Sequence, residues 1–279
     1  MAAKNKARRA QVFLEILRDE GVAVDGRTQI LDLGCGAGQL VTAGRALGFD
    51  FFGAGYQLYD AHEPASPELV GQGVLRQITD DPYRLPFEDG FFDVVISDQV
   101  FEHVMDYPAT LREMHRVLKP GGVFLHIFPS KYMVVEPHVN VPFAGVMHAR
   151  WWMKAWALVG IRNEFQKKLS ASQASEDSLR YLSTRTNYLN KRQLRRQFGQ
   201  LFTDVRFVER AFLKTSRRGR QVYRMSKWLP FLPALYSTLG SRVALGRRPA
   251  LAVAGAAGER AGQPSQDGRA FEATFASRS

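Results

Sequence analysis

Residues 31–38 read Leu31-Asp32-Leu33-Gly34-Cys35-Gly36-Ala37-Gly38, and this stretch decides the fold. It ends a short β-rich run that begins at Thr28, and it leads into Gln39–Leu47, whose apolar residues have helical spacing. Glycine permits a sharp turn and lets a ligand approach the backbone closely. The stretch therefore predicts a strand, a ligand-binding turn and a helix, in that order.

The spacing of the glycines and the acidic residue before them narrow the class of ligand. The glycines follow the pattern G-x-G-x-G, whereas a nicotinamide-binding turn uses G-x-G-x-x-G, whose third glycine would fall on Gln39. A carboxylate at Asp32 would repel a pyrophosphate and attract an ammonium group. The turn thus favours a ligand that presents positive charge.

Outward from this turn, strand and helix signals alternate through the first half of the chain. An amphipathic helix is predicted at 11–20 and another helix at 108–118. Strands are predicted at 49–55, 74–78, 91–97 and 123–128. After residue 129 the alternation stops, and it resumes with a helix at 191–202 and strands at 205–213 and 241–247. We expect an α/β fold in which helices cover both faces of the sheet.

These segments divide the chain into four parts. Residues 1–129 hold the first five strands, 130–185 form a cap inserted after the fifth strand, and 186–248 complete the sheet. Residues 249–279 are rich in Ala, Gly and Ser without periodicity, which predicts a disordered tail.

Composition bounds the class of protein. The chain has 279 residues, of which 45% are hydrophobic and 23% charged, and this excludes global disorder and a fibrous protein. Its single cysteine excludes an internal disulfide and a thiolate zinc cluster and indicates a reducing compartment, so we expect a cytoplasmic protein. No uncharged apolar run reaches the roughly 18 residues that a membrane-spanning helix requires.

The net charge of +11 is distributed unevenly. The balance is −6 over residues 1–149, +13 over 150–224 and +4 over 225–279. Such a basic half either forms a solvated face or binds an anionic partner, which could be a phosphorylated small molecule, a lipid head group or RNA.

The motifs along residues 28–129 resemble those of class I S-adenosylmethionine-dependent methyltransferases. The glycine stretch looks like their first motif, and later segments agree with the large subgroup that acts mostly on small molecules. These segments are Asp81 before Leu85-Pro86-Phe87, Phe92-Asp93-Val94-Val95-Ile96-Ser97, Phe101-Glu102-His103-Val104, and the run from Leu111 to Gly122. The resemblance implies a Rossmann-like seven-stranded sheet, S-adenosylmethionine as the cofactor, and a cofactor crevice at the carboxyl ends of the strands.

Carried over residue by residue, the resemblance also implies a cofactor site. It places Asp32, Gly34, Gly36 and Gly38 around the methionine portion, with Cys35 packed in the turn. It places Asp81 near the adenine amino group, and Asp98 and Gln99 under the sulfonium.

One departure from the family pattern lies at the end of the second strand. The family usually has an acidic residue there that binds the ribose hydroxyls, whereas this chain has Gly55. Tyr56 and Gln57 follow it and are candidate cofactor contacts, and Gln57 or Asp60 is a candidate substitute for the acid. If neither substitutes, the chain would be a weak binder or a catalytically inactive protein of methyltransferase fold.

Methyl transfer needs aligned reactants, and a general base only where a hydroxyl loses its proton. The candidate bases are His103, after the fourth strand, and His138, in the loop after the fifth, because both fall on the crevice side by topology. Some quinone-pathway methyltransferases have a Glu-x-x-Glu-His array at the position of His103, but Gln99 replaces the first acid here. Gln99, Glu102 and His103 would make a poor divalent site, so the sequence predicts no metal.

The predicted cap would select the acceptor. Trp151, Trp152 and Trp156 at helical spacing are either packing residues or an apolar floor for a prenyl, acyl or aromatic group, and neighbouring basic residues suit an anion. We expect transfer to oxygen of a small-molecule, sugar or lipid-linked acceptor, with peripheral contact to the inner membrane face through Trp228–Leu239. RNA is the alternative acceptor, although no base-flipping motif or RNA-binding module is present in the sequence.

Overall fold

The computed structural model describes residues 2–60, 63–216 and 219–250. The predicted tail, 249–279, therefore lies outside the described residues except for its first two.

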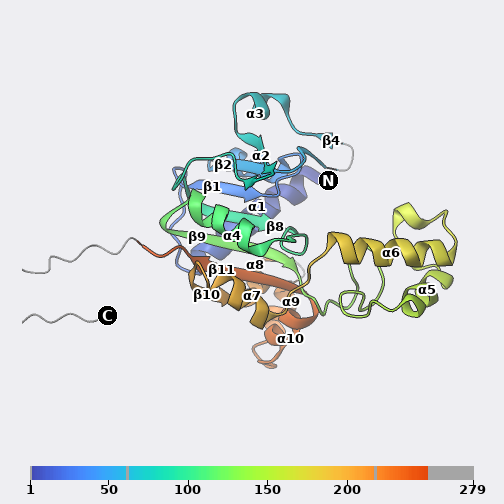
Figure 1. Cartoon of the computed structure of the whole chain (residues 1–279). Coiled ribbons are helices and arrows are strands. Elements are labelled where there is room, and N and C mark those ends of the chain that lie inside the picture. The colour runs from blue at the N-terminus through green and yellow to red at the C-terminus, as the bar shows by residue number, and fades with distance from the viewer. Residues whose placement is uncertain (1, 61–62, 217–218, 251–279) are drawn as a thin grey trace, which may run out of the picture.

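A seven-stranded sheet forms the centre of the molecule (Figure 1), and its strand order is β10-β11-β9-β8-β1-β2-β5. The strands are β1 (Gln29–Leu33), β2 (Asp50–Gly55), β5 (Leu75–Gln77), β8 (Phe92–Asp98), β9 (Leu118–Pro129), β10 (Thr203–Phe207) and β11 (Ser241–Arg247). The five strands from β9 to β5 are parallel, whereas β11 runs antiparallel to both β9 and β10. The expected seven-stranded α/β fold of class I is confirmed.

Successive side chains of a strand point to opposite faces of the sheet, and helices cover both faces. Ile30 and Val94 belong to the core on one face, whereas their neighbours Leu31 and Val95 belong to the core on the other. The first face is covered by α1 (Ala2–Asp19), α2 (Gln39–Ala46) and α8 (Glu209–Thr215), and the second by α4 (Tyr107–Val117) and α7 (Lys191–Phe198). This two-residue alternation is what the sheet geometry requires when both faces are buried.

Further elements lie outside the central sheet. They are β3 (Tyr59–Asp60), β4 (Glu63–Pro64), α3 (Pro67–Gly71), β6 (Thr79–Asp80), β7 (Tyr83–Arg84), α5 (Arg150–Leu158), the 3₁₀ turn η1 (Glu164–Gln166), α6 (Ala171–Arg185), α9 (Gly219–Met225) and α10 (Leu232–Leu239). None of the described helices combines the length and apolar character that crossing a bilayer requires.

The cap, residues 130–185, extends sideways from the sheet as a helical lobe of α5 and α6 (Figure 1). It has a small core of its own, to which Val139, Met153 and Leu182 belong. Trp152 and Trp156 pack against that core, and the Trp152 indole donates a 2.8 Å hydrogen bond to the Pro142 carbonyl, whereas Trp151 is exposed. Two of the three tryptophans therefore hold the cap together.

Two predicted segments near the C-terminus need correction. The predicted strand 205–213 is β10 only up to Phe207, and Glu209–Thr215 is the helix α8. The run Ala211-Phe212-Leu213 is continuously apolar, and such a run fits a buried helix as well as a strand. The predicted helix 191–202 ends at Phe198, where Gly199 follows as the C-terminal cap.

Candidate functional site

The glycine turn connects β1 to α2 and requires glycine for steric reasons. Gly34 and Gly38 have φ angles of +80° and +77°. A Cβ atom on Gly34 would lie 2.4 Å from the Val100 side chain, and one on Gly38 would lie 2.4 Å from the Leu75 side chain. Because larger residues are excluded here, the backbone of the turn remains open to a ligand.

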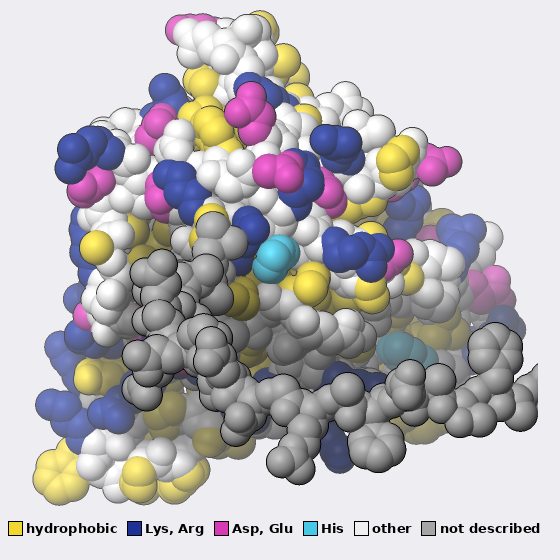
Figure 2. Space-filling model, turned by 60° about the vertical axis from the view of Figure 1, so that its left-hand side comes forward, with side chains coloured by type: hydrophobic (Ala, Val, Ile, Leu, Met, Phe, Trp, Pro, Cys, Tyr) yellow, Lys and Arg dark blue, Asp and Glu magenta, His cyan; other side chains and the backbone are white. Residues whose placement is uncertain are grey.

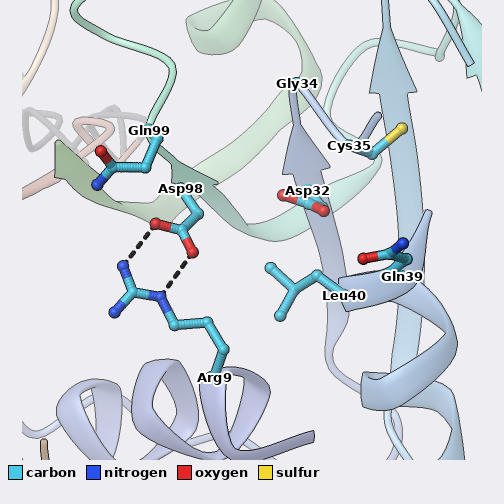
Figure 3. Close-up of a pocket in the computed structure, with 8 residues that line it drawn as sticks. All are labelled: Arg9, Asp32, Gly34, Cys35, Gln39, Leu40, Asp98 and Gln99. Carbon is cyan, nitrogen blue, oxygen red and sulfur yellow. Dashed lines mark hydrogen bonds and ion pairs between the residues drawn. The ribbon is translucent and has the colours of Figure 1, made fainter. Parts of the chain in front are cut away.

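A pocket of 190 Å³ lies beside this turn, at the carboxyl ends of β1 and β8 (Figure 3). The lining residues are Arg9, Asp32, Gly34, Cys35, Gln39, Leu40, Asp98 and Gln99. Figure 3 shows Arg9 reaching from α1 toward Asp98, while Gln39 and Leu40 lie on the opposite side at the start of α2. The pocket thus lies where open α/β sheets bind their ligands.

The charges of the pocket come from two carboxylates and one guanidinium. Asp32 is only 3% exposed. Arg9 forms a bidentate pair with Asp98, with N···O distances of 2.6 and 2.5 Å, and its guanidinium lies 5.5 Å from the ring centres of Phe13 and Phe212. A ligand with both a positive and a negative end would find complementary groups here.

These features fit S-adenosylmethionine. Its sulfonium and ammonium groups suit the carboxylates of Asp32 and Asp98, its carboxylate suits Arg9 or the backbone N–H groups of the turn, and the glycines leave space for close approach. Cys35 lines the same pocket, but burial, and secondarily the charge of Asp32, raises the pKa of its thiol. Cys35 is therefore a packing residue and not a nucleophile.

Five of the residues expected at the cofactor do not line this pocket, and their contacts with the cofactor stay predictions. Gly36 and Gly38 shape the turn without lining the pocket. Tyr56 and Gln57 are exposed beyond the end of β2, and Asp81 is exposed in the turn of the β6–β7 hairpin.

Asp80, the residue before Asp81, contacts Tyr56, and no sequence signal indicated this contact. Burial, and then the charge and hydrogen bond of Asp80, raise the pKa of Tyr56 to about 12. The ring of Tyr56 also lies 6.0 Å from that of Tyr83, between centres. The β6–β7 hairpin is therefore attached to the segment that follows β2.

Gly55 ends β2 directly against the glycine turn. A Cβ atom built on it would lie 3.2 Å from the Gln57 carbonyl oxygen, 3.6 Å from the Cys35 sulfur and 3.6 Å from the Gly36 nitrogen. The missing acidic side chain would therefore have started beside the pocket, and a side chain at this position needs only a small adjustment of its neighbours.

His103 and His138 meet, although they lie 35 positions apart in the sequence. Their Nε2 atoms lie 3.1 Å apart. The Nδ1 atom of His103 lies 2.7 Å from the Arg185 carbonyl oxygen, and the Asn187 backbone N–H donates a 2.7 Å hydrogen bond to the Glu102 carbonyl. The segment after α6 thus fastens the cap to the turn that follows β8.

Glu136 orients His138. Its carboxylate lies 2.6 Å from His138 Nδ1, accepts a 2.6 Å hydrogen bond from the Tyr188 hydroxyl, and accepts backbone N–H bonds from His138 and Val139. Burial by itself would raise the pKa of Glu136, but the hydrogen bonds from His138 and Tyr188 outweigh it and lower the pKa. An ionised Glu136 holds the His138 ring with Nε2 directed at His103.

Glu102 completes this group. It is 1% exposed, and neither carboxylate oxygen has a hydrogen-bond partner in the structure. Burial raises its pKa to about 8, and the charges of Asp98 and Glu136 add to the effect. A carboxylate oxygen of Glu102 and a ring nitrogen of each histidine lie within 4.8 Å of one another. We call Glu102, His103 and His138 the histidine cluster.

Sequence reasoning missed several members of the two sites. Arg9, Gln39 and Leu40 line the pocket, and Glu136 and Tyr188 support the histidine cluster. Gln39 and Leu40 could have been found, because the residues that open a helix after a glycine turn face the ligand. Arg9 and Tyr188 carried no such signal, since each reaches its site only through tertiary packing.

This chain is similar in sequence to known proteins. Residues 31–126 match a family described as a methyltransferase domain. The demethylmenaquinone methyltransferases of Staphylococcus aureus strains JH9 and Newman are each 29% identical to this chain over 201 residues, which cover 68% of this chain and 73% of the relative.

Two solved structures align with this chain as follows. Phosphoethanolamine N-methyltransferase 2 of Haemonchus contortus, in complex with S-adenosyl-L-methionine, aligns with a TM-score of 0.48 and 16% identity over 85% of this chain and 52% of that chain. This chain thus spans about half the length of the Haemonchus protein. YcgJ of Bacillus subtilis aligns with a TM-score of 0.45 and 15% identity over 85% of this chain and 97% of that chain.

Proposed function

Since this chain is a class I S-adenosylmethionine-dependent methyltransferase, with its methyltransferase domain at residues 31–126, we propose that it methylates a hydroxyl oxygen of a small-molecule, sugar or lipid-linked acceptor. The observation that carries the proposal is the position of the histidine cluster next to the cofactor pocket. Gln99 lines the pocket, and Glu102 and His103 follow it in the same turn after β8.

The cofactor, when bound, supplies a methyl group on a positively charged sulfur that keeps the bonding electron pair as the methyl leaves. The acceptor oxygen forms the new bond to carbon and must release its hydrogen as a proton. His103 and His138 are the catalytic residues of this proposal, because their Nε2 atoms accept that proton beside the pocket. Glu136 is a positioning residue, since it holds the His138 ring.

An acceptor with an apolar part fits the cap. Beyond the cap's own core, Leu158, Val159 and Phe165 are exposed, and Phe165 is 83% exposed. Exposed Lys167 and Lys168 lie two and three residues after Phe165. The Staphylococcus relatives are named for a lipid quinone, demethylmenaquinone, and the reduced form of a quinone carries hydroxyl groups. A prenylated hydroquinone is therefore the first acceptor to test.

Membrane contact belongs to the same proposal. Trp228 and Phe231, between α9 and α10, are 87% and 57% exposed, and exposed Arg224 and Lys227 precede them. Figure 2 shows hydrophobic side chains beside Lys and Arg at the lower edge of the molecule, where Figure 1 places the turn before α10. Aromatic residues next to basic ones suit the surface of an anionic bilayer.

The test of the function is methyl transfer with an identified product. The enzyme is incubated with methyl-labelled S-adenosylmethionine and demethylmenaquinol in vesicles, with an unprenylated naphthohydroquinone as the second acceptor. We expect label in the extracted lipid, an O-methyl resonance in its NMR spectrum, and a rate roughly 100-fold lower for His103→Gln, because the base is removed. A product methylated on carbon would contradict transfer to oxygen, and no label in either acceptor would contradict the proposed acceptor class.

Membrane contact is tested by sedimentation with vesicles. We expect the chain to sediment with phosphatidylglycerol vesicles and not with phosphatidylcholine vesicles, and Trp228→Ser/Phe231→Ser to weaken sedimentation. Trp151→Ser, at an exposed tryptophan of the cap, is the matched control. Equal sedimentation of both variants would contradict binding through α9 and α10.

A further inference from the structure

The hydrogen bonds of the histidine cluster fix where its protons lie. A backbone carbonyl only accepts hydrogen bonds, so the Nδ1 atom of His103, 2.7 Å from the Arg185 carbonyl, carries a hydrogen. Glu136 accepts bonds from a hydroxyl and two backbone N–H groups, as an ionised carboxylate does, so the Nδ1 atom of His138 also carries a hydrogen.

Both Nε2 atoms are consequently lone-pair acceptors in the neutral rings. They face each other at 3.1 Å, and two acceptors at this distance require a positive charge between or beside them. A shared proton would satisfy the two nitrogens, but it would leave the buried carboxylate of Glu102 without a partner.

Besides the two facing nitrogens, the buried carboxylate of Glu102 points to a metal ion. Its carboxylate is buried, has no hydrogen-bond partner, and belongs to the group whose ligand atoms lie within 4.8 Å of one another. Among the ion pairs of the described residues, none joins Glu102 or Glu136 to a lysine or arginine. A buried carboxylate without a partner, as in Glu102, is costly, and a divalent cation would provide the missing partner.

We propose that Glu102, His103 and His138 bind a divalent transition-metal ion, with zinc the best match, through one carboxylate oxygen and two Nε2 atoms. Two imidazoles and one carboxylate are a ligand set that zinc accepts, and three protein ligands leave a position open. Nitrogens 3.1 Å apart can both lie about 2.1 Å from one ion. The Arg185 carbonyl and Glu136 hold the opposite nitrogens, as the outer partners of metal-binding histidines do.

This inference differs from the sequence prediction of no metal. That prediction considered Gln99, Glu102 and His103, which are close in the sequence. The third ligand, His138, comes instead from the loop that enters the cap, and only the folded chain brings it to Glu102 and His103.

The coordination position that the three protein ligands leave free would let the ion act on an acceptor beside the pocket. It would accept an oxygen of the acceptor and favour loss of its proton, and the two histidines would then act as ligands of the ion. This role rests on the proposed function, whereas the binding of the metal does not.

The test is metal binding by the whole chain after removal of metals with EDTA and dialysis. We expect one zinc ion to bind per chain in a calorimetric titration, and cobalt(II) to give the visible absorption of a site with nitrogen ligands. Glu102→Gln and His138→Ala should each weaken zinc binding at least 10-fold. Glu136→Gln should weaken it roughly 10- to 100-fold, because it supports a ligand without touching the ion.

His148→Ala is the matched control, because His148 is an exposed histidine of the same cap. It should bind zinc as the unchanged chain does. Zinc should raise the midpoint of thermal unfolding in the control and not in His138→Ala, and circular dichroism of the metal-free variants shows whether they fold. Absence of stoichiometric binding, or equal binding by Glu102→Gln, His138→Ala and the control, would overturn the proposal.

The same variants separate the metal site from the methyl transfer. His138→Ala should still bind S-adenosylmethionine, because His138 does not line the cofactor pocket. Zinc binding without methylation of any acceptor would refute the proposed acceptor and leave the metal site standing. Methylation by a chain that binds no zinc would refute the metal site alone.

Discussion

The cofactor pocket and the histidine cluster are neighbours that are assembled in opposite ways. Seven of the eight residues that line the pocket lie between Asp32 and Gln99, at the ends of β1 and β8 and the start of α2. The histidine cluster and its supports come from the turn after β8, the loop after β9 and the segment after α6. A contiguous motif, residues 32–40, supplies five of the eight residues that line the pocket, whereas long-range packing brings the histidine cluster together.

The largest expected effect tests whether the contiguous motif controls cofactor binding. Asp32→Asn removes a buried negative charge that, according to the predicted cofactor site, would face the positive end of S-adenosylmethionine. Charged hydrogen bonds contribute about 1.5–3 kcal/mol each, so we expect binding to weaken roughly 100-fold in a calorimetric titration.

The matched control is Asp93→Asn, at the start of β8. Asp93 accepts hydrogen bonds from the Gln29 backbone and from Lys119, so this change should lower stability and leave cofactor affinity unaltered. If the two variants bound the cofactor equally well, Asp32 would have no direct role in the pocket.

The second variant restores the acidic residue that the end of β2 lacks. Gly55→Glu places a carboxylate beside the glycine turn, where the resemblance puts the ribose hydroxyls. The backbone there has no positive φ, and the nearest atom to a new Cβ is 3.2 Å away. We expect S-adenosylmethionine to bind roughly 10- to 100-fold more tightly, as measured by calorimetry.

Gly55→Ala is its control, because it adds the Cβ atom without an acceptor. It should bind like the unchanged chain. If Gly55→Glu bound the cofactor no more tightly than Gly55→Ala, the ribose would have to be held elsewhere.

The third prediction concerns His126, a histidine of the sheet that lies outside the histidine cluster and whose burial makes stability depend on pH. His126, in β9, is completely buried, stacks on Phe124 with ring centres 4.9 Å apart, and lies 2.8 Å from the Ser97 hydroxyl. Burial lowers its pKa well below the usual 6.5. The folded chain therefore keeps His126 neutral, while the unfolded chain protonates it below pH 6.5, so stability is lost as the pH falls through that value.

Replacing both hydrogen-bonded partners, as Ser97→Ala/His126→Phe, should remove this contribution. The dependence of the unfolding free energy on pH below about 6.5 should become shallower by about 1.4 kcal/mol per pH unit. Urea unfolding at about pH 7 and about pH 5.5 measures the difference. The same slope in both proteins would contradict a neutral His126, because the other histidines are present in each.

The smallest effect concerns how independent the cap is of the sheet. Trp152→Phe removes the hydrogen bond to the Pro142 carbonyl and should destabilise the cap by about 1 kcal/mol. Hydrogen exchange of amides in α5 and α6 should become faster, while exchange in β1 and β8 and the affinity for S-adenosylmethionine stay the same. Trp151→Phe, at an exposed position, is the control. Equal acceleration in β1 would show that the cap and the sheet unfold together.

The fold followed from the sequence because its signals are local. The alternation of apolar runs and helical spacing predicted β1, α2, β2, β5, β8 and α4 close to their observed bounds. The prediction of strand 205–213 was right up to Phe207 and wrong from Glu209, because the continuous run Ala211-Phe212-Leu213 fits a buried helix equally well. Periodicity does not separate the two in a run this short.

The α/β sheet, the glycine turn and the acidic pocket residue Asp32 could be predicted from the sequence, since each depends on neighbours along the chain. Tertiary structure alone decided that Arg9 of α1 pairs with Asp98, and that His138 faces His103 with Glu102 and Glu136 beside them. The physical reason is that contacts between distant segments depend on how helices pack and where a cap returns to the sheet. The spacing of residues within one segment does not predict where the cap contacts the sheet.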